Sequence, residues 1–434
     1  MRVTDLSGVW RFQEDPRGSG MEEKWFHYTL TDQINIPGIM QAQGYGDDIT
    51  HDTCWMSSLH DNMWYLREEY KGAQAEGVNV PFLAQPPKHY MGQAWYQREF
   101  EVTEEDEGSY FRLFIECAKW NTKVWVDDEY VGGEMSLCAP HEFALGSLSV
   151  GEHRLTICVD NGFLLPYRPD GHGITDATAA TWNGLVGRVE LCALPAVYIN
   201  KAAVYPDYDT RTVTVKGIIN KVSAGNEKIT LTVNDIKKEY LIKKTKSEFS
   251  VDVEYPRTAE AWDEFTPVLH TISIKLEGIS QGTGFVDSRE IKFGFRKLET
   301  YDGRFYVNGR QAYFRGTHFG GEFPLTGHPA TGVKEWKRIF NVCKEWGLNF
   351  MRFHSYCPPE AAFEAADELG IYLQVECGMW NCFREDNDML LVLKEETKRI
   401  LSSFGNHPSF VMLSPSNEPA GGWFGQLMEW VKFV

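Results

Sequence analysis

Glu418 is the residue of this sequence that is best placed to do acid–base chemistry. An apolar run from Phe410 to Leu413 stands between two prolines, and it is long enough for a buried parallel strand but too short for a helix. Asn417 and Glu418 follow at the expected C-terminal end of this strand. There, the carboxyl group is a candidate general acid/base and the amide could hydrogen-bond a substrate hydroxyl. The alternative is that Glu418 is a loop residue that caps the next helix.

The chain before this segment alternates between short apolar strands and stretches of helical periodicity. Strands are predicted at 312–316, 350–353, 371–375 and before Ser414, and helices at 331–346, 359–369, 390–404 and from 425 onward. Such repetition is typical of a parallel sheet covered by helices, and here it provides four strand–helix units. We therefore predict the first half of a (β/α)₈ barrel at residues 300–434.

Several polar side chains follow these strands. In a (β/α)₈ barrel the C-terminal ends of all strands form one rim, where chemistry collects. The candidates at this rim are His318 and Glu322 after the first strand, His354 and Tyr356 after the second, Glu376 after the third, and Asn417 with Glu418 after the fourth.

The first two thirds of the chain are rich in β-strand patterns. Alternating apolar residues bounded by turn signals predict a β-sandwich at residues 1–195 and a second, immunoglobulin-like sandwich at 196–299. Trp95, Trp120 and Trp125 could stack on sugars, but such residues more often fill a sandwich core. The segment 167–182 shows no alternation, and so long a loop indicates either function or disorder.

Composition limits the partners of the chain. A formal net charge of −18 without a basic cluster disfavours nucleic acid and anionic membrane surfaces. The nine scattered cysteines indicate free thiols in a reducing compartment rather than disulfides or zinc ligands, and we expect no metal and no cofactor. The N-terminus lacks the apolar core of a signal peptide, which predicts a cytoplasmic protein. A chain whose signal peptide had been trimmed would look the same.

Seven motifs in this order resemble glycoside hydrolase family 2, the family of the microbial β-galactosidases and β-glucuronidases. The resemblance covers nearly the whole chain. The motifs are Leu6-Ser-Gly-Val-Trp-Arg-Phe12, Ile36-Pro-Gly38, Trp95-Tyr-Gln-Arg-Glu-Phe100, Trp182-Asn-Gly-Leu-Val-Gly-Arg-Val-Glu-Leu191, Gly294-Phe-Arg296, Gly347-Leu-Asn-Phe-Met-Arg-Phe-His354 and Ser416-Asn-Glu-Pro419. The resemblance implies a sugar-binding jelly roll at the N-terminus and retaining hydrolysis of a terminal, β-linked sugar.

The resemblance also implies roles for the candidates at the rim. Glu418 takes the acid/base role, and Asn417 contacts the sugar 2-hydroxyl. Glu376 matches an acidic residue that lines the family's pocket, with a structural salt bridge as the alternative. The family's Ser-His-Tyr-Pro is His354-Ser-Tyr-Cys-Pro358 here, so the histidine that holds substrate hydroxyls is displaced by one residue. The family's Arg-His-Glu after the first strand is replaced by Phe319-Gly-Gly321.

A further departure lies in the loop that reaches the family's active site. The family commonly has an Asp where this chain has Thr178, and Asp176 or His172 is a candidate substitute. The family's nucleophile follows the seventh strand, so we expect it beyond residue 434 and expect this chain alone to be inactive. Glu322 or Glu376 could serve only as an improvised nucleophile.

The sequence therefore predicts a jelly roll, an immunoglobulin-like sandwich and half a barrel that act on a carbohydrate. The open half barrel favours association with another copy of the chain. The alternative is a carbohydrate-binding protein without catalysis.

Overall fold

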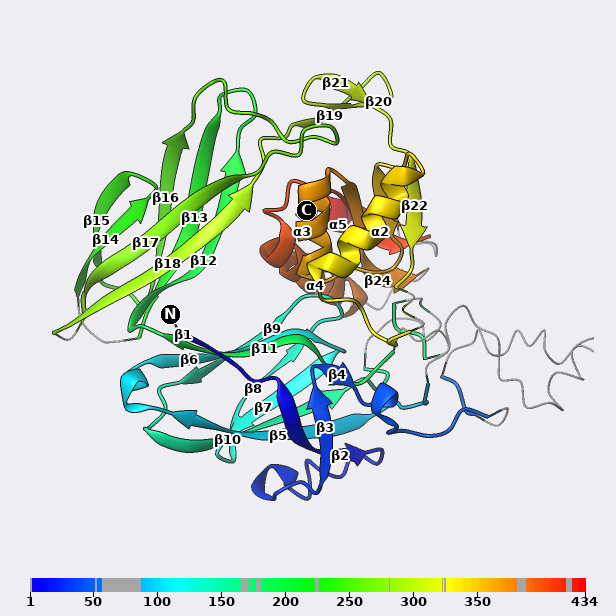
Figure 1. The fold of residues 1–434 in the computed structure, drawn as a ribbon. Helices are drawn as coiled ribbons and strands as arrows, with labels where there is room; N and C mark the ends of the chain where they lie inside the picture. Colours follow the sequence, from blue (N-terminus) through cyan, green and yellow to red (C-terminus); the bar gives the residue numbers. More distant parts are fainter. Residues whose placement is uncertain are drawn as a thin grey trace, which may run out of the picture.

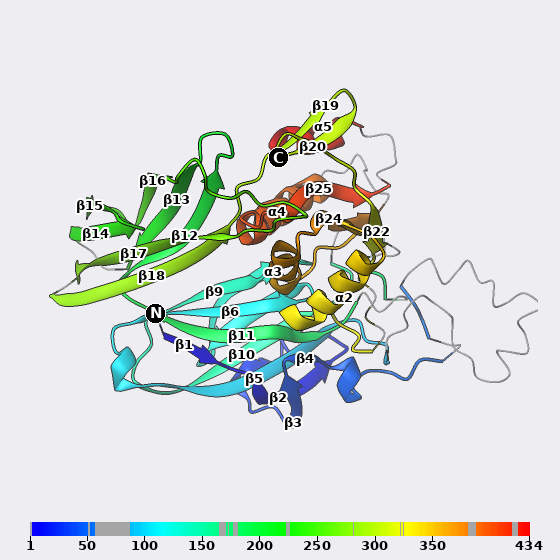
Figure 2. The ribbon, with the colours of Figure 1, turned by 45° about the horizontal axis from the view of Figure 1, so that its top comes forward.

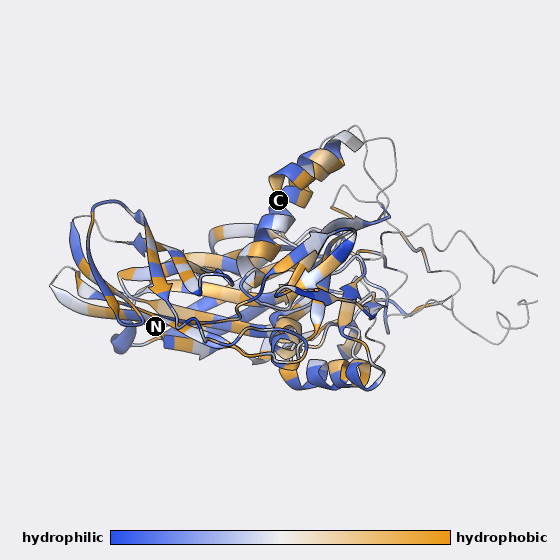
Figure 3. Ribbon diagram, turned by 90° about the horizontal axis from the view of Figure 1, so that it is seen from above, coloured by the Kyte–Doolittle hydropathy of each residue, from blue (hydrophilic) through white to orange (hydrophobic). Residues whose placement is uncertain are grey.

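The computed structural model describes residues 2–50, 53–56, 87–164, 171, 173–176, 181–222, 226–280, 282–321, 323, 325–380, 388–418 and 424–434. It confirms the predicted fold class, with two β-sandwiches followed by part of a barrel (Figure 1). Along the strands, hydrophobic and hydrophilic residues alternate, as expected for sheets with one buried face (Figure 3). No helix in the described part of the chain is long and apolar enough to cross a membrane.

The first sandwich contains two antiparallel sheets. One has the order β1 (Arg2–Asp5), β11 (Gly184–Leu194), β6 (Tyr110–Ala118) and β9 (His141–Gly146), with β4 (Gly38–Ile39) also on β11. The other has the order β3 (Asp32–Ile36), β2 (Gly8–Asp15), β5 (Gln93–Val102), β10 (Gly151–Asp160), β7 (Asn121–Val126) and β8 (Glu129–Met135). Buried aliphatic and aromatic side chains, such as Phe12, Leu113 and Ile157, fill the space between the two sheets.

The three tryptophans that we considered for sugar stacking are core residues. Trp95, Trp120 and Trp125 are each at most 2% exposed, which favours the packing interpretation over sugar stacking. Trp95 and Trp125 pack beneath the segment that carries Trp25 and Phe26. Trp120 belongs to a different cluster, which is built mainly by the barrel.

The second sandwich is formed by a three-stranded and a four-stranded sheet. The three-stranded sheet has the order β12 (Val197–Pro206), β13 (Thr212–Lys221) and β16 (Lys246–Glu254). The four-stranded sheet has the order β15 (Ile236–Ile242), β14 (Glu227–Val233), β17 (His270–Ser280) and β18 (Thr283–Phe293). Valine and isoleucine fill its core, as their preference for a half-buried pleated surface predicts.

A small antiparallel sheet stands between the second sandwich and the barrel. It contains β19 (Leu298–Tyr301), β20 (Arg304–Val307) and β21 (Arg310–Ala312). We predicted the first barrel strand at 312–316, and this was wrong. Ala312 ends β21, Phe314 packs against Phe350 and Tyr372, and the first barrel strand starts only at Gly316.

The barrel region has four parallel strands in consecutive order, β22 (Gly316–Phe319), β23 (Phe350–Phe353), β24 (Tyr372–Trp380) and β25 (Phe410–Asn417). They alternate with α2 (Val333–Glu345), α3 (Glu360–Leu369) and α4 (Asp388–Phe404), and α5 (Phe424–Phe433) follows. The N-cap of α2 is Gly332 rather than the expected Thr331, and Trp346, expected on the apolar face, is 81% exposed.

The first sandwich and the barrel share one hydrophobic core. Trp120, Leu137 and Ile174 of the sandwich pack in the same cluster as Phe353 of β23 and Leu393 of α4. Figure 2 shows α2 and α3 beside the sheet that contains β6 and β11. The position of the barrel strands is thus fixed by contacts to the N-terminal sandwich as well as by their own helices.

Candidate functional site

Asn417 and Glu418 lie at the C-terminal end of β25, as predicted. β25 runs on through Pro415, so Asn417 is its last residue and Glu418 follows directly. Asn417 is 7% exposed, whereas Glu418 is exposed. Glu418 has a φ of 45°, in the left-handed region that residues other than glycine rarely adopt. Such backbone costs on the order of 1–3 kcal/mol and is found disproportionately at functional sites.

Arg352 of β23 joins the ends of β24 and β25. Its Nε donates to Oε1 of Glu376 at 2.7 Å, and its Nη2 donates to Oδ1 of Asn417 at 2.6 Å. The second oxygen of Glu376 accepts the backbone N–H of Ser355 at 2.6 Å. Glu376 is 1% exposed, so both of its oxygens are occupied inside the protein. Glu376 therefore forms a salt bridge with Arg352, which is the alternative that the sequence analysis gave for this residue.

Arg352 was not among the predicted site residues, although it stands in the motif at 347–354. A signal was present in the sequence, since Arg352 stands between the apolar residues Met351 and Phe353, and both of these belong to the core that the helices share. Side chains alternate along a strand, so an arginine between them must face the barrel interior.

The two histidines come together at the rim. His318 is exposed near the end of β22, and His354 follows β23, with 5.7 Å between their ring centroids. The backbone N–H of His354 donates to the carbonyl of Phe319 at 2.9 Å. Neighbouring parallel strands that end at the same level bring these side chains together, as the pattern predicted.

Tyr356 occupies a different environment from the histidines. It is 6% exposed, and its ring packs against Phe353 and Phe323 within the hydrophobic core. Burial raises the pKa of its phenol well above the usual value. Its hydroxyl has no hydrogen-bond partner among the described residues.

The loop of Asp176 reaches the barrel, but the carboxylate of Asp176 is held by the sandwich. Gly173 packs so closely on the barrel that a Cβ there would lie 2.5 Å from the carbonyl oxygen of Ser355. Oδ2 of Asp176 accepts the N–H of Met56 at 2.8 Å and lies 3.0 Å from Nε2 of His89. The other two loop and rim candidates, His172 and Glu322, lie outside the described residues.

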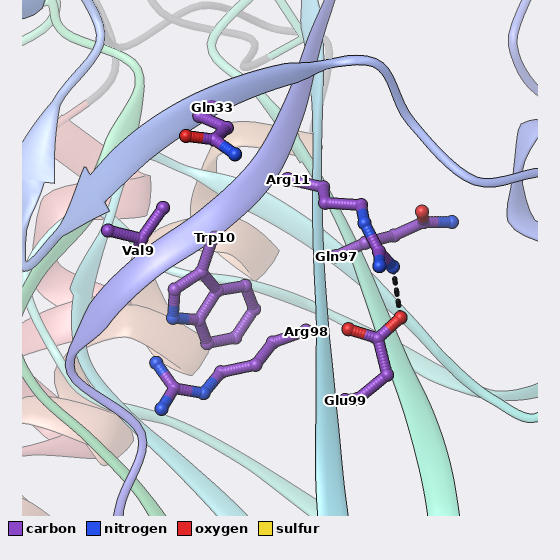
Figure 4. A pocket seen from close by; sticks show the side chains of 7 residues that line it. All are labelled: Val9, Trp10, Arg11, Gln33, Gln97, Arg98 and Glu99. Carbon is purple, nitrogen blue, oxygen red and sulfur yellow. Dashed lines mark hydrogen bonds and ion pairs between the residues drawn. The ribbon is translucent and has the colours of Figure 1, made fainter.

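A cavity of about 310 Å³ lies in the first sandwich, where β2 diverges from β5 (Figure 4). Arg98 lies in this gap and donates to the carbonyls of Leu6 and Ser7 at 2.8 and 2.7 Å, and Arg11 pairs with Glu99. None of the predicted site residues lines it. Within the described ranges, no group of three or more His, Cys, Asp or Glu is arranged to hold a metal ion.

Comparison with known proteins places this geometry in a family. The sequence models that match are "Glycosyl hydrolases family 2, sugar binding domain" at residues 3–195, "Glycosyl hydrolases family 2" at 197–296, and "Glycosyl hydrolases family 2, TIM barrel domain" at 298–434. A β-glucuronidase of Paenibacillus borealis is 26% identical over 96% of this chain and 68% of its own length. A β-galactosidase of Pseudoalteromonas haloplanktis is 24% identical over 96% of this chain and 40% of its own length.

Solved structures show the same fold. A family 2 β-galacturonidase from Eisenbergiella tayi bound to galacturonate matches with a TM-score of 0.74 at 19% identity, covering 100% of this chain and 69% of that one. A β-glucuronidase from Ruminococcus gnavus in complex with D-glucaro-δ-lactam matches with a TM-score of 0.72 at 16% identity, covering 100% and 69%. The chain thus spans about two thirds of these enzymes and less than half of the Pseudoalteromonas relative. Since three consecutive models of one family together span nearly all of its residues, the chain belongs to glycoside hydrolase family 2.

Proposed function

We propose that this chain supplies the acid/base half of a retaining glycosidase that hydrolyses a terminal, β-linked sugar. The observation that carries the proposal is the Asn417–Glu418 pair at the end of the fourth parallel strand, with the Asn417 carbonyl occupied by Arg352. Because the oxygen of this amide accepts from Arg352, its Nδ2 hydrogens are the donors that we propose for a sugar hydroxyl oxygen. Glu418 then lies one residue further along, next to the glycosidic oxygen.

The reaction has two steps in this proposal. In the first, protonated Glu418 gives its proton to the leaving oxygen while a second carboxylate attacks the anomeric carbon and forms a glycosyl ester. In the second, Glu418, now ionised, takes a proton from water, whose oxygen attacks the anomeric carbon and releases the second carboxylate. The sugar keeps its β configuration because it is inverted twice.

The second carboxylate is not assigned to any described residue. It has to lie roughly 5 to 5.5 Å from the acid/base, with an oxygen available for attack. Glu376 does not suit this role, since its oxygens accept from Arg352 and from the Ser355 N–H. We infer that the nucleophile comes from barrel strands beyond β25, and that the 434 residues alone bind sugar without hydrolysing it.

The test uses the protein extended through the remaining barrel strands. Nitrophenyl β-glycosides of galactose, glucuronate and galacturonate identify the sugar, and Glu418→Ala is then assayed with and without azide. An acid/base variant of a retaining enzyme should regain turnover with azide and release a glycosyl azide of β configuration. A product of α configuration would refute the retaining mechanism, and sugar binding without any turnover would favour a carbohydrate-binding protein without catalysis.

A further inference from the structure

A turn of the first sandwich is anchored on a buried carboxylate of the barrel. Glu396 of α4 is 4% exposed, and its Oε1 accepts the backbone N–H groups of Leu137 at 3.1 Å and Cys138 at 3.0 Å. Its Oε2 accepts the hydroxyl of Ser136 at 2.8 Å. A buried carboxylate is tolerated only when it is hydrogen-bonded, and here all three donors come from the sandwich. We name residues 136–138 the anchor turn.

The anchor turn presses Leu137 against the irregular end of β24. The pairing of β24 with β25 shifts register between Glu376 and Met379, and Gly378 within this irregularity has a φ of 82°. A Cβ on Gly378 would lie 2.8 Å from Cδ1 of Leu137. A β-bulge lacks the regular ladder of hydrogen bonds, so its shape depends on what packs against it.

The bulge is supported from two more sides. A Cβ on Gly173, in the loop of the sandwich that also carries Asp176, would lie 2.7 Å from the carbonyl oxygen of Gly378. On the helix side, Sγ of Cys377 lies 3.5 Å from Oγ1 of Thr397, the residue after Glu396, and Thr397 also accepts the indole N–H of Trp430 at 2.8 Å. The end of β24 is thus enclosed by the sandwich and by α4.

We propose that Glu396 is a positioning residue for the sugar site. By holding the anchor turn against Gly378, it fixes the end of β24 and hence Glu376, which in turn orients Arg352 and Asn417. The consequence for sugar binding rests on the function proposed above. The positional claim itself concerns only the chain's own contacts.

Three variants distinguish a positioning role of Glu396 from a role that only stabilises the contact between the first sandwich and the barrel. Glu396→Leu keeps a similar volume but orphans all three donors. Glu396→Gln keeps its Oε1 for Leu137 and Cys138 and offers Nε2 to Ser136, so it should restore the contact. Glu395→Leu is the matched control, because Glu395 is an exposed neighbour on α4 whose carboxylate pairs with Lys398.

The first readout is amide hydrogen exchange of the 434-residue chain at Ser355, whose N–H is donated to Glu376. We expect amide exchange at Ser355 to accelerate about tenfold or more in Glu396→Leu, while exchange at Ile274 of the second sandwich stays unchanged. In Glu396→Gln and Glu395→Leu, exchange at Ser355 should stay near the wild-type rate. If Glu396→Leu does not fold, Leu137→Ala is used instead. It keeps the hydrogen bonds between Glu396 and the anchor turn but removes the contact of Leu137 with Gly378. Two outcomes would overturn the proposal. One is normal protection of Ser355 in a Glu396→Leu variant whose Leu137 and Cys138 amides have lost theirs. The other is normal protection of Ser355 in a folded Leu137→Ala variant.

The second readout is binding of D-glucaro-δ-lactam and of galactono-lactone by calorimetry. Whichever probe binds wild type should bind Glu396→Leu about tenfold more weakly. If neither binds wild type, the sugar assignment fails while the exchange experiment still decides the positional claim. If Ser355 exchange accelerates but the affinity does not change, the end of β24 does not govern the sugar site and the positioning role is refuted.

Discussion

The side-chain carbonyl of Asn417 lies 2.6 Å from Nη2 of Arg352, although the two residues are on strands that are not neighbours in the sheet. The arginine reaches across β24, whose Glu376 it binds on the way. One guanidinium thus sets the position of a buried acid and of the amide next to the proposed catalytic acid, which makes Arg352 the first residue to test.

Arg352→Met should destabilise the fold and abolish sugar binding. The substitution leaves Glu376 as a buried carboxylate without its cation, which typically costs about 3–5 kcal/mol. Arg352→Lys should recover part of the stability but not the affinity, because an ammonium cannot bridge two partners as a planar guanidinium does. Urea unfolding and calorimetry measure the two effects. Arg310→Met, at an exposed pair with Asp263, is the control and should cost about 1 kcal/mol or less. Equal affinity of wild type and Arg352→Lys would contradict the bridging role.

Glu418→Gln should slow substrates with poor leaving groups far more than nitrophenyl glycosides in the enzyme extended through the remaining barrel strands. Only a poor leaving group needs a proton to depart, and general acid catalysis contributes roughly 10²–10⁴-fold to its rate. A series of aryl glycosides with phenols of graded pKa provides the measurement. Uniform losses along this series would remove Glu418 from the acid role.

His141 should make the protein less stable as the pH falls from about 6.5 to 4. Burial lowers the pKa of its imidazole from 6.5 to about 4, while its ring lies 2.7 Å from the hydroxyl of Thr122. Between these two values the unfolded chain binds a proton that the folded chain does not, so the free energy of unfolding decreases with falling pH, by roughly 3 kcal/mol for this group. Below about pH 4 its contribution no longer changes with pH.

Urea unfolding of wild type and His141→Gln between pH 4 and 7 would isolate this contribution. The variant should show a shallower loss of stability, since glutamine does not titrate. Burial raises the pKa of Glu396, and this works in the opposite direction, because the folded state then holds the proton more tightly than the unfolded one. Identical pH profiles of wild type and His141→Gln would refute the assignment to His141.

The 434-residue chain should self-associate through the open edge of its parallel sheet. In the described part of the chain β22 pairs with β23 on one side, and its residues Gly316 to His318 are exposed. An unpaired strand edge is a template for another strand, and a lysine at such an edge blocks pairing. Light scattering should therefore show larger species for wild type than for Thr317→Lys. Thr230→Lys on the internal strand β14 is the control and should behave like wild type. A monodisperse wild-type monomer would exclude the interaction.

The sequence located Glu418 and Asn417 because a short apolar run between prolines leaves few alternatives for a strand. It failed at the ends of strands. Pro415 was expected to stop β25, yet the strand continues through it. In the described sheet β25 pairs only with β24, so a residue without a backbone N–H can stand on its unpaired side. The bulge at Gly378 likewise extends β24 to Trp380 and places Glu376 inside the strand rather than after it.

The relations that cross the fold could not be predicted from sequence patterns. Arg352 acts on residues of two other strands, and periodicity reports only which face of its own strand a side chain occupies. Glu396 looked like any polar residue of an amphipathic helix, although its partners belong to another domain. Trp346 has helical spacing with the core residues of α2, but it lies at the C-cap, where the chain turns away from the core.

The anchor turn also has a consequence for the order in which the protein is made. Ser136 and Glu396 are 260 residues apart, so the ribosome delivers the sandwich long before α4 exists. Domains generally fold as units during synthesis, with the N-terminal one first. When α4 emerges, its acceptor Glu396 meets donors that are already in place on a folded surface. We therefore expect the folded sandwich to offer a surface on which the apolar strands of the barrel can pack before the barrel's own sheet is complete.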